Sequence, residues 1–135
     1  MFDLHPTLAK DTYAVTNLPL CTVRLMDNKI FPWLILVPQV EGVREWIDLE
    51  REQQHQLSDE IAITSHILQA LTTPDKLNVA ALGNQVAQLH VHVIARYKTD
   101  QAWPEPVWGK GREYYAQEEA DGFLKDLRIA LDSVF

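Results

Sequence analysis

The chain has 135 residues, of which 47% are hydrophobic and 23% are charged. This length predicts one domain over residues 1–135 with a single hydrophobic core, and the composition excludes a disordered chain. The net charge of -7 argues against a long nucleic acid polymer as partner, because binding many phosphates usually requires a basic face. Small nucleotides stay possible, since a few N–H groups suffice to hold one or two phosphates.

Cysteine usage and the lack of export signals constrain the compartment. Cys21 is the only cysteine, so no internal disulfide can form, which suits a reducing environment. A secretory signal has a basic stretch followed by an apolar run, and residues 1–11 contain no such pattern. The apolar run at residues 33–37 is too short to cross a bilayer. We therefore expect a cytoplasmic protein without a membrane partner.

The first part of the chain predicts a β-hairpin. Residues 1–20 contain two prolines and predict at most one or two helical turns. Residues 21–26 alternate and are rich in β-branched side chains, which predicts a strand, and residues 27–29 supply turn chemistry. The continuous apolar run of residues 33–37 predicts a second strand, buried on both faces. These two strands could pair as a hairpin with a long tip.

The middle of the chain predicts one long helix. Residues 43–47 are compatible with a helical turn, and residues 48–71 carry the clearest helical pattern. Pro74 ends this helix because proline cannot continue it. Side chains suited to a buried face recur at spacings of three and four: Leu57, Ile61, Thr64, Leu68 and Leu71.

The last part of the chain predicts two strands and a helix. Residues 77–82 predict a strand, Gly83–Asn84 a turn, and the sharply alternating residues 88–97 another strand. A loop rich in proline and tryptophan follows at residues 103–109. Residues 117–133 predict an amphipathic helix, with an apolar side made by Phe123, Leu124, Leu127 and Leu131.

The order of these elements predicts an α+β fold. Strands and helices are segregated along the chain, and short turns join the strands that we expect to be neighbours. This arrangement favours an antiparallel sheet of about five strands, with the long helix packed on one face and a C-terminal helix beside it.

The residues that could carry chemistry lie on the predicted strand at residues 88–97. Side chains alternate along a strand, so Gln88, His90 and His92 should share one face. The Cα atoms of the two histidines should then lie roughly 6.5–7 Å apart. The apolar residues between them would point to the other face, so the sequence predicts a polar platform backed by the core.

Spacing alone leaves three interpretations of this platform open. The two imidazoles could be ordinary residues of an exposed sheet face. They could also ligate a metal ion, which needs a third and usually a fourth ligand. His5, His55 and His66 are scattered along the sequence, so we assign no metal ligand. The third interpretation is an active site in which an imidazole acts on a substrate.

Residues 83–96 resemble the motif of the histidine triad (HIT) family, three alternating histidines preceded by a short glycine-containing phosphate loop. Gln88 stands at the first histidine, His90 at the middle one and His92 at the third. The resemblance implies a HIT-like fold and makes His90 the nucleophile that forms a covalent nucleotidyl-histidine. It implies that His92 donates to phosphate oxygens. Glutamine cannot titrate, so this departure leaves the branch of the family open.

The resemblance also assigns residues that would contact the substrate. Gly83, Asn84 and Gln85 match the phosphate loop, and Asn28 matches a position that contacts ribose. Asn78 is a weaker candidate of the same kind, and Gln88 is included through its place in the motif. The downstream tryptophans, Trp103 and Trp108, are expected to serve packing or a dimer interface.

The resemblance implies a hydrolase or nucleotidyl transferase for nucleoside phosphate derivatives, such as dinucleoside polyphosphates or nucleoside phosphoramidates. We expect a homodimer whose partner is a small nucleotide, without a required cofactor, although Mg²⁺ could accompany the substrate. Two alternatives stay open: a non-catalytic nucleotide-binding dimer, and a metal-dependent hydrolase that uses His90 and His92 as ligands.

Overall fold

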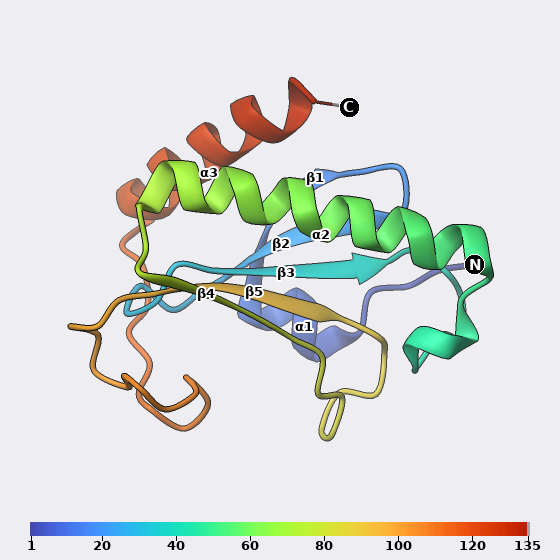
Figure 1. Cartoon of the computed structure of the whole chain (residues 1–135), viewed down its shortest axis with the longest axis horizontal. Helices are drawn as coiled ribbons and strands as arrows, with labels where there is room; N and C mark the ends of the chain where they lie inside the picture. The colour runs from blue at the N-terminus through green and yellow to red at the C-terminus, as the bar shows by residue number, and fades with distance from the viewer. Residues whose placement is uncertain (135) are drawn as a thin grey trace.

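A computed structural model describes residues 1–134 and contains an antiparallel sheet of five strands (Figure 1). The strand order is β1-β2-β3-β5-β4, and every pairing is antiparallel. The predicted α+β fold is confirmed. The elements are α1 (Pro6–Asp11), β1 (Thr12–Asn17), β2 (Cys21–Met26), β3 (Trp33–Pro38), a 3₁₀ turn (Trp46–Asp48), α2 (Arg51–Thr72), β4 (Lys76–Ala80), β5 (Val91–Arg96) and α3 (Gln117–Asp132).

Both faces of the sheet are covered. Helices α2 and α3 pack on one face, as expected for the long and the C-terminal helix, whereas α1 lies on the other face (Figure 1). The predicted β2–β3 hairpin is confirmed, with Val23 opposite Leu36. Alternate side chains of β3 therefore enter two separate cores, Leu34 toward α2 and Ile35 toward α1, which explains why the whole strand is buried.

Strand β1 was not expected, since residues 1–20 predicted only one or two helical turns. Those turns form α1, and the chain then continues directly as a strand paired with β2. A bulge between Ala14 and Thr16 shifts the register, so the buried residues Thr12 and Val15 are three positions apart. The bulge removes the period-two pattern by which a strand is recognised in a sequence.

Helix α2 begins at Arg51 rather than at residue 48, because the preceding residues form the 3₁₀ turn. It ends at Thr72, and Thr73 adopts a left-handed conformation at φ 44° before Pro74. Leu71 was expected on the buried face but is 42% exposed. The missed member of that face is Glu60, which is fully buried and accepts hydrogen bonds from the N–H groups of Leu20 and Cys21.

Two strand boundaries also differ from the expected ones. Strand β5 begins at Val91, so the residues from Gln88 to His90 precede the strand, with a bend at Gln88. Strand β4 begins at Lys76 and ends at Ala80, before the expected residue 82. No helix within residues 1–134 has the length and apolar character needed to cross a bilayer.

Candidate active site

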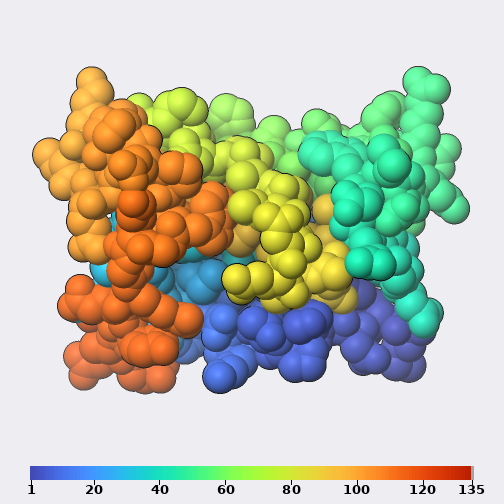
Figure 2. Space-filling model, turned by 90° about the horizontal axis from the view of Figure 1, so that it is seen from below, coloured from blue at the N-terminus to red at the C-terminus, as the bar shows by residue number. Residues whose placement is uncertain are grey.

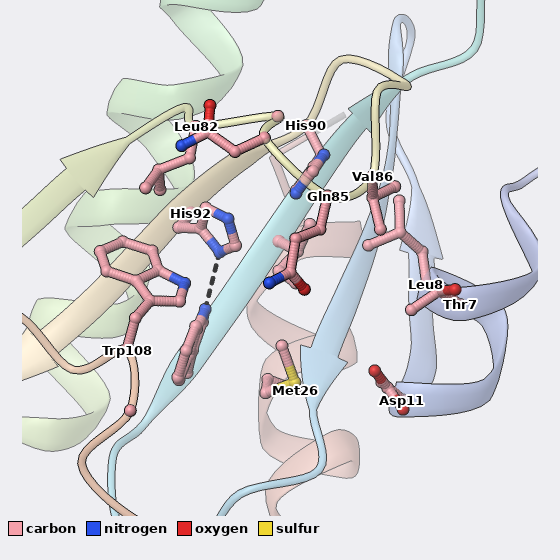
Figure 3. Close-up of a pocket in the computed structure, with 15 residues that line it drawn as sticks. Thr7, Leu8, Asp11, Met26, Leu82, Gln85, Val86, His90, His92 and Trp108 are labelled. Atoms are coloured by element: carbon pink, nitrogen blue, oxygen red, sulfur yellow. Dashed lines mark hydrogen bonds between the residues drawn. The ribbon is translucent and has the colours of Figure 1, made fainter.

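A cavity of about 450 Å³ opens on the face of the sheet that carries α1 (Figure 3). Its floor comes from β3 and β5, and α1 forms one wall. Residues 82–86 form a second wall, and Trp108 with Gly109 forms a third. Seen from this side, residues 80–88 lie beside the N-terminal segment (Figure 2). Segments that are far apart in the sequence therefore enclose one site.

His90 and His92 both line this cavity, as the alternation predicted. Their ring centroids are 4.9 Å apart, and the ring planes meet at 71°. Although His90 precedes the strand, it lines the same cavity as His92 (Figure 3). The exposed fractions are 7% and 4%, so neither histidine is an ordinary residue of an exposed sheet face.

A hydrogen bond assigns the tautomer of His90. Its Nδ1 lies 2.7 Å from the backbone oxygen of Gln88. A carbonyl oxygen can only accept, so Nδ1 must carry the proton. In the neutral ring the lone pair is then on Nε2, which makes Nε2 the nitrogen available for attack on an electrophile.

His92 has the opposite tautomer. The indole Nε1 of Trp33 donates to its Nδ1 at 2.9 Å, and an indole N–H can only donate. The neutral His92 ring therefore carries its proton on Nε2. Burial, together with the neighbouring His90, lowers the pKa of His92 to about 3, so the ring is neutral near pH 7. One lone pair and one N–H donor thus stand side by side in the cavity.

The loop between β4 and β5 contributes Gly83, Asn84 and Gln85 to the cavity lining. Gly83 has φ +70°, a conformation that other residues rarely adopt, and it lets the loop turn back toward the histidines. The Gln85 side chain extends along the cavity between His90 and Met26 (Figure 3). The loop that was expected to hold phosphate is therefore adjacent to the two imidazoles.

The side chain of Gln88 lies apart from the histidine pair. It is not among the residues that line the cavity, and its side-chain amide binds the N-terminal segment. Its Oε1 accepts from the His5 N–H at 2.9 Å, and its Nε2 donates to the Asp3 oxygen at 2.8 Å. Alternation predicted a shared face because it assumed a strand from residue 88, whereas the chain bends at Gln88 and β5 begins only at Val91.

The structure uses the two asparagine candidates in protein contacts. Asn28 is buried; its Nδ2 donates to the Gly111 oxygen and its Oδ1 accepts from the Ile30 N–H. It borders an adjoining cavity of about 380 Å³ rather than the one with the histidines. Asn78 accepts from Arg96 at 2.8 Å and lines neither cavity. The geometry brings neither asparagine to the histidine pair.

Several residues that line the cavity were not singled out as site residues in the sequence, among them Leu8, Asp11, Met26 and Trp33. Trp33 is the first residue of an apolar run, so the sequence indicates a core residue and gives no sign that its indole N–H donates to His92. Trp108, expected to serve packing or dimerisation, lies with its ring centroid 5.0 Å from that of His92 and lines the cavity. Only the fold reveals these roles, because the residues come from segments that are separate in sequence.

Within the part of the chain that the structure describes, no group of three or more His, Cys, Asp or Glu side chains is arranged to hold a metal ion. His90 and His92 are two nitrogen ligands at most. The Nδ1 of His92 is already engaged by Trp33.

The family model of the HIT domain matches residues 8–99. A histidine triad protein from Marinobacter aquaeolei has 45% identity and a TM-score of 0.96 over 100% of this chain and 99% of its own. One from Bradyrhizobium japonicum has 45% identity and a TM-score of 0.93 over 96% and 97%. One from Sinorhizobium meliloti has 41% identity and a TM-score of 0.93 over 96% of both chains. No curated protein matches.

The fold and the paired histidines therefore define a class of proteins that bind nucleotides, many of which are nucleotide hydrolases or transferases. This chain belongs to the HIT family.

Proposed function

We propose that the chain is a hydrolase or nucleotidyl transferase that acts on nucleoside phosphate derivatives through a covalent nucleotidyl-His90. Dinucleoside polyphosphates and nucleoside phosphoramidates are the substrates that we favour. The observation that carries the proposal is the pair of opposite tautomers, with a lone pair on His90 Nε2 beside an N–H donor on His92.

The reaction would proceed in two displacements at phosphorus. His90 Nε2 attacks the α-phosphorus, a P–N bond forms, and the bond from phosphorus to the leaving group breaks. The leaving group departs with the bonding electron pair and takes a proton from solvent. Water, or another acceptor with an O–H group, then attacks the same phosphorus, releases its proton to solvent and returns the P–N electron pair to Nε2.

The surrounding groups suit this chemistry. When Nε2 binds phosphorus, the His90 ring becomes positively charged, and the Gln88 carbonyl oxygen on Nδ1 stabilises that charge. His92 Nε2–H and the N–H groups of Gly83 to Gln85 would bind the phosphate oxygens. The apolar side chains of Leu8 in α1 and Met26 at the end of β2 line the same cavity and would receive the nucleoside. Mg²⁺ could accompany the substrate, but no step requires it.

The nucleophile is tested by His90→Ala, with His66→Ala as the matched control because His66 is exposed on α2. Both variants are assayed on a panel of dinucleoside polyphosphates and nucleoside phosphoramidates. We expect kcat/KM to fall on the order of a thousandfold for His90→Ala alone. Wild type quenched with denaturant at alkaline pH, where a P–N bond to histidine survives, should also gain the mass of one nucleotidyl group. Equal turnover by the two variants would remove His90 as nucleophile.

A non-catalytic nucleotide-binding protein is the second candidate. It is favoured by Gln88, which replaces a triad histidine and directs its amide away from the cavity. Calorimetry separates the two: nucleoside monophosphate binding without turnover on any panel member supports this candidate, and turnover that depends on His90 rules it out.

We also propose a homodimer in the cytoplasm, because a chain with one cysteine forms no internal disulfide and suits a reducing compartment. Strand β4 is an edge of the sheet and exposes 49% of Val79, so its outer side is open to a second strand. Light scattering of the purified protein measures the mass. A monomer at micromolar concentration would contradict the proposal.

A further inference from the structure

The side chain of Gln88 makes two hydrogen bonds to a segment that is far away in the sequence. Its amide accepts from His5 N–H and donates to the Asp3 oxygen, 83 and 85 residues away in the chain. A glutamine amide has both a donor and an acceptor, so it pairs with a backbone as a neighbouring strand would. The N-terminal segment is thereby attached to the residues that precede β5 (Figure 2).

The attached segment leads directly into a wall of the cavity. His5 is followed by α1, and its Nδ1 accepts from the Thr7 N–H at the start of that helix. Thr7, Leu8 and Asp11 of α1 line the cavity (Figure 3). A helix of six residues has little stability of its own, so its position depends on the contacts at its ends and on the buried Leu8.

The backbone of Gln88 orients His90, and this role is independent of the contact that its side chain makes with the N-terminal segment. Its carbonyl oxygen accepts from His90 Nδ1, and it is present whatever side chain occupies the position. The neighbouring Leu89 N–H is held by the Val43 oxygen at 3.0 Å, which anchors this backbone independently of the N-terminal segment. A substitution of the Gln88 side chain should therefore detach the N-terminal segment that leads into α1, and leave the His90 ring in its orientation.

We infer that Gln88 is a positioning residue whose amide holds α1 against the cavity, so that substrate affinity, and not the displacement at phosphorus, depends on its side chain. The kinetic part of this inference rests on the proposed function, whereas the structural part does not. It gives the glutamine at the first triad position a purpose other than substrate contact.

Hydrogen exchange of residues 1–11 tests the structural part without any substrate. Gln88→Met keeps the length of the side chain and removes both hydrogen bonds, and we expect these amides to exchange about tenfold faster than in wild type. His5 N–H reports directly, since Gln88 is its acceptor. Gln85→Met is the matched control and should exchange as wild type, because Gln85 lies on the cavity side of the loop. Exchange unchanged in Gln88→Met would overturn the inference.

Kinetics test the functional part. For Gln88→Met we expect KM to rise about tenfold with kcat within about twofold of wild type, a split that general destabilisation would not produce. A fall in kcat at constant KM would overturn the inference, since it would place the effect on His90. If wild type shows no turnover, the proposed function fails. The hydrogen-exchange result then still tests whether the Gln88 amide holds the N-terminal segment.

A second substitution keeps the test available if Gln88→Met does not fold. Gln88→Glu retains an acceptor for His5 N–H and loses only the donor to the Asp3 oxygen. Faster exchange of residues 1–4 is expected. Exchange of the whole segment at the wild-type rate would overturn the inference.

Discussion

At the scale of single residues, the site depends on two hydrogen bonds that select opposite tautomers for His90 and His92. Two neutral imidazoles 4.9 Å apart, with the same tautomer, would present two lone pairs or two donors to the cavity. The observed bonds give one of each. Trp33 therefore acts on chemistry through His92, and we regard it as a positioning residue.

Trp33→Phe should lose this selection. Without the indole N–H, the neutral His92 ring becomes a mixture of tautomers, and its Nδ1 is free to take a proton, which raises its pKa. We expect kcat to fall about tenfold. The ¹⁵N resonances of labelled histidine rings report the tautomer directly. Trp108→Phe is the control, since it removes an indole of the same cavity but leaves the bond from Trp33 in place. An unchanged His92 spectrum in Trp33→Phe would contradict the assignment.

At the scale of elements, α2 is joined to the β1–β2 turn by one buried carboxylate. Glu60 accepts from Leu20 N–H and Cys21 N–H, both at 2.8 Å, and from Gln56 Nε2 at 2.7 Å. The helix thus contributes a polar partner as well as an apolar face, and the turn would otherwise leave two N–H groups without an acceptor.

Glu60→Ala should therefore be costly. It leaves two backbone donors without their acceptor, and we expect the free energy of unfolding in urea to fall by about 2–4 kcal/mol. Asp59→Ala changes the adjacent, exposed carboxylate and should shift it by less than about 0.5 kcal/mol. Similar losses in the two variants would mean that the buried contacts contribute little.

The elements also mark how far sequence reasoning reaches. The β2–β3 hairpin, α2 and α3 follow from local patterns in the sequence. These patterns are the alternation in β2, the continuous apolar run in β3, and the spacings of three and four in the two helices. Strand β1 does not, because its bulge breaks the period. The histidine pair is visible as an alternation, whereas Trp33 and Asp11 reach the cavity only through tertiary packing. The Gln88 contact with residues 3–5 spans most of the chain and has no local signal.

At the scale of the whole molecule, the buried neutral His92 makes stability depend on pH. Its folded pKa of about 3 lies below the unfolded value of about 6.5, so the unfolded state binds more protons between these values. Stability from the neutral ring is fully present above about pH 6.5 and is lost as pH falls toward 3. Asp100, whose burial is outweighed by hydrogen bonds from Arg96 and backbone N–H groups, has a pKa of about 2 and stays ionised at pH 4.5.

Lowering the pH from 7 to 4.5 should therefore reduce the free energy of unfolding by an amount on the order of 2 kcal/mol through His92. Urea titrations at both pH values measure the change. His92→Gln removes the titrating ring and should show a correspondingly smaller difference between the two pH values. A difference as large as in wild type would assign the pH effect to other groups.

Two neighbouring interior strands, β3 and β5, are buried along their whole length, with a separate core on either side of the sheet. The histidines stand on this doubly packed base, while the surfaces that would meet the rest of a ligand come from a short helix and two loops. Changes in those segments would reshape what enters the cavity without disturbing the two imidazole rings. Under the proposed function, related chains would then differ in the molecules they select and share the displacement at phosphorus.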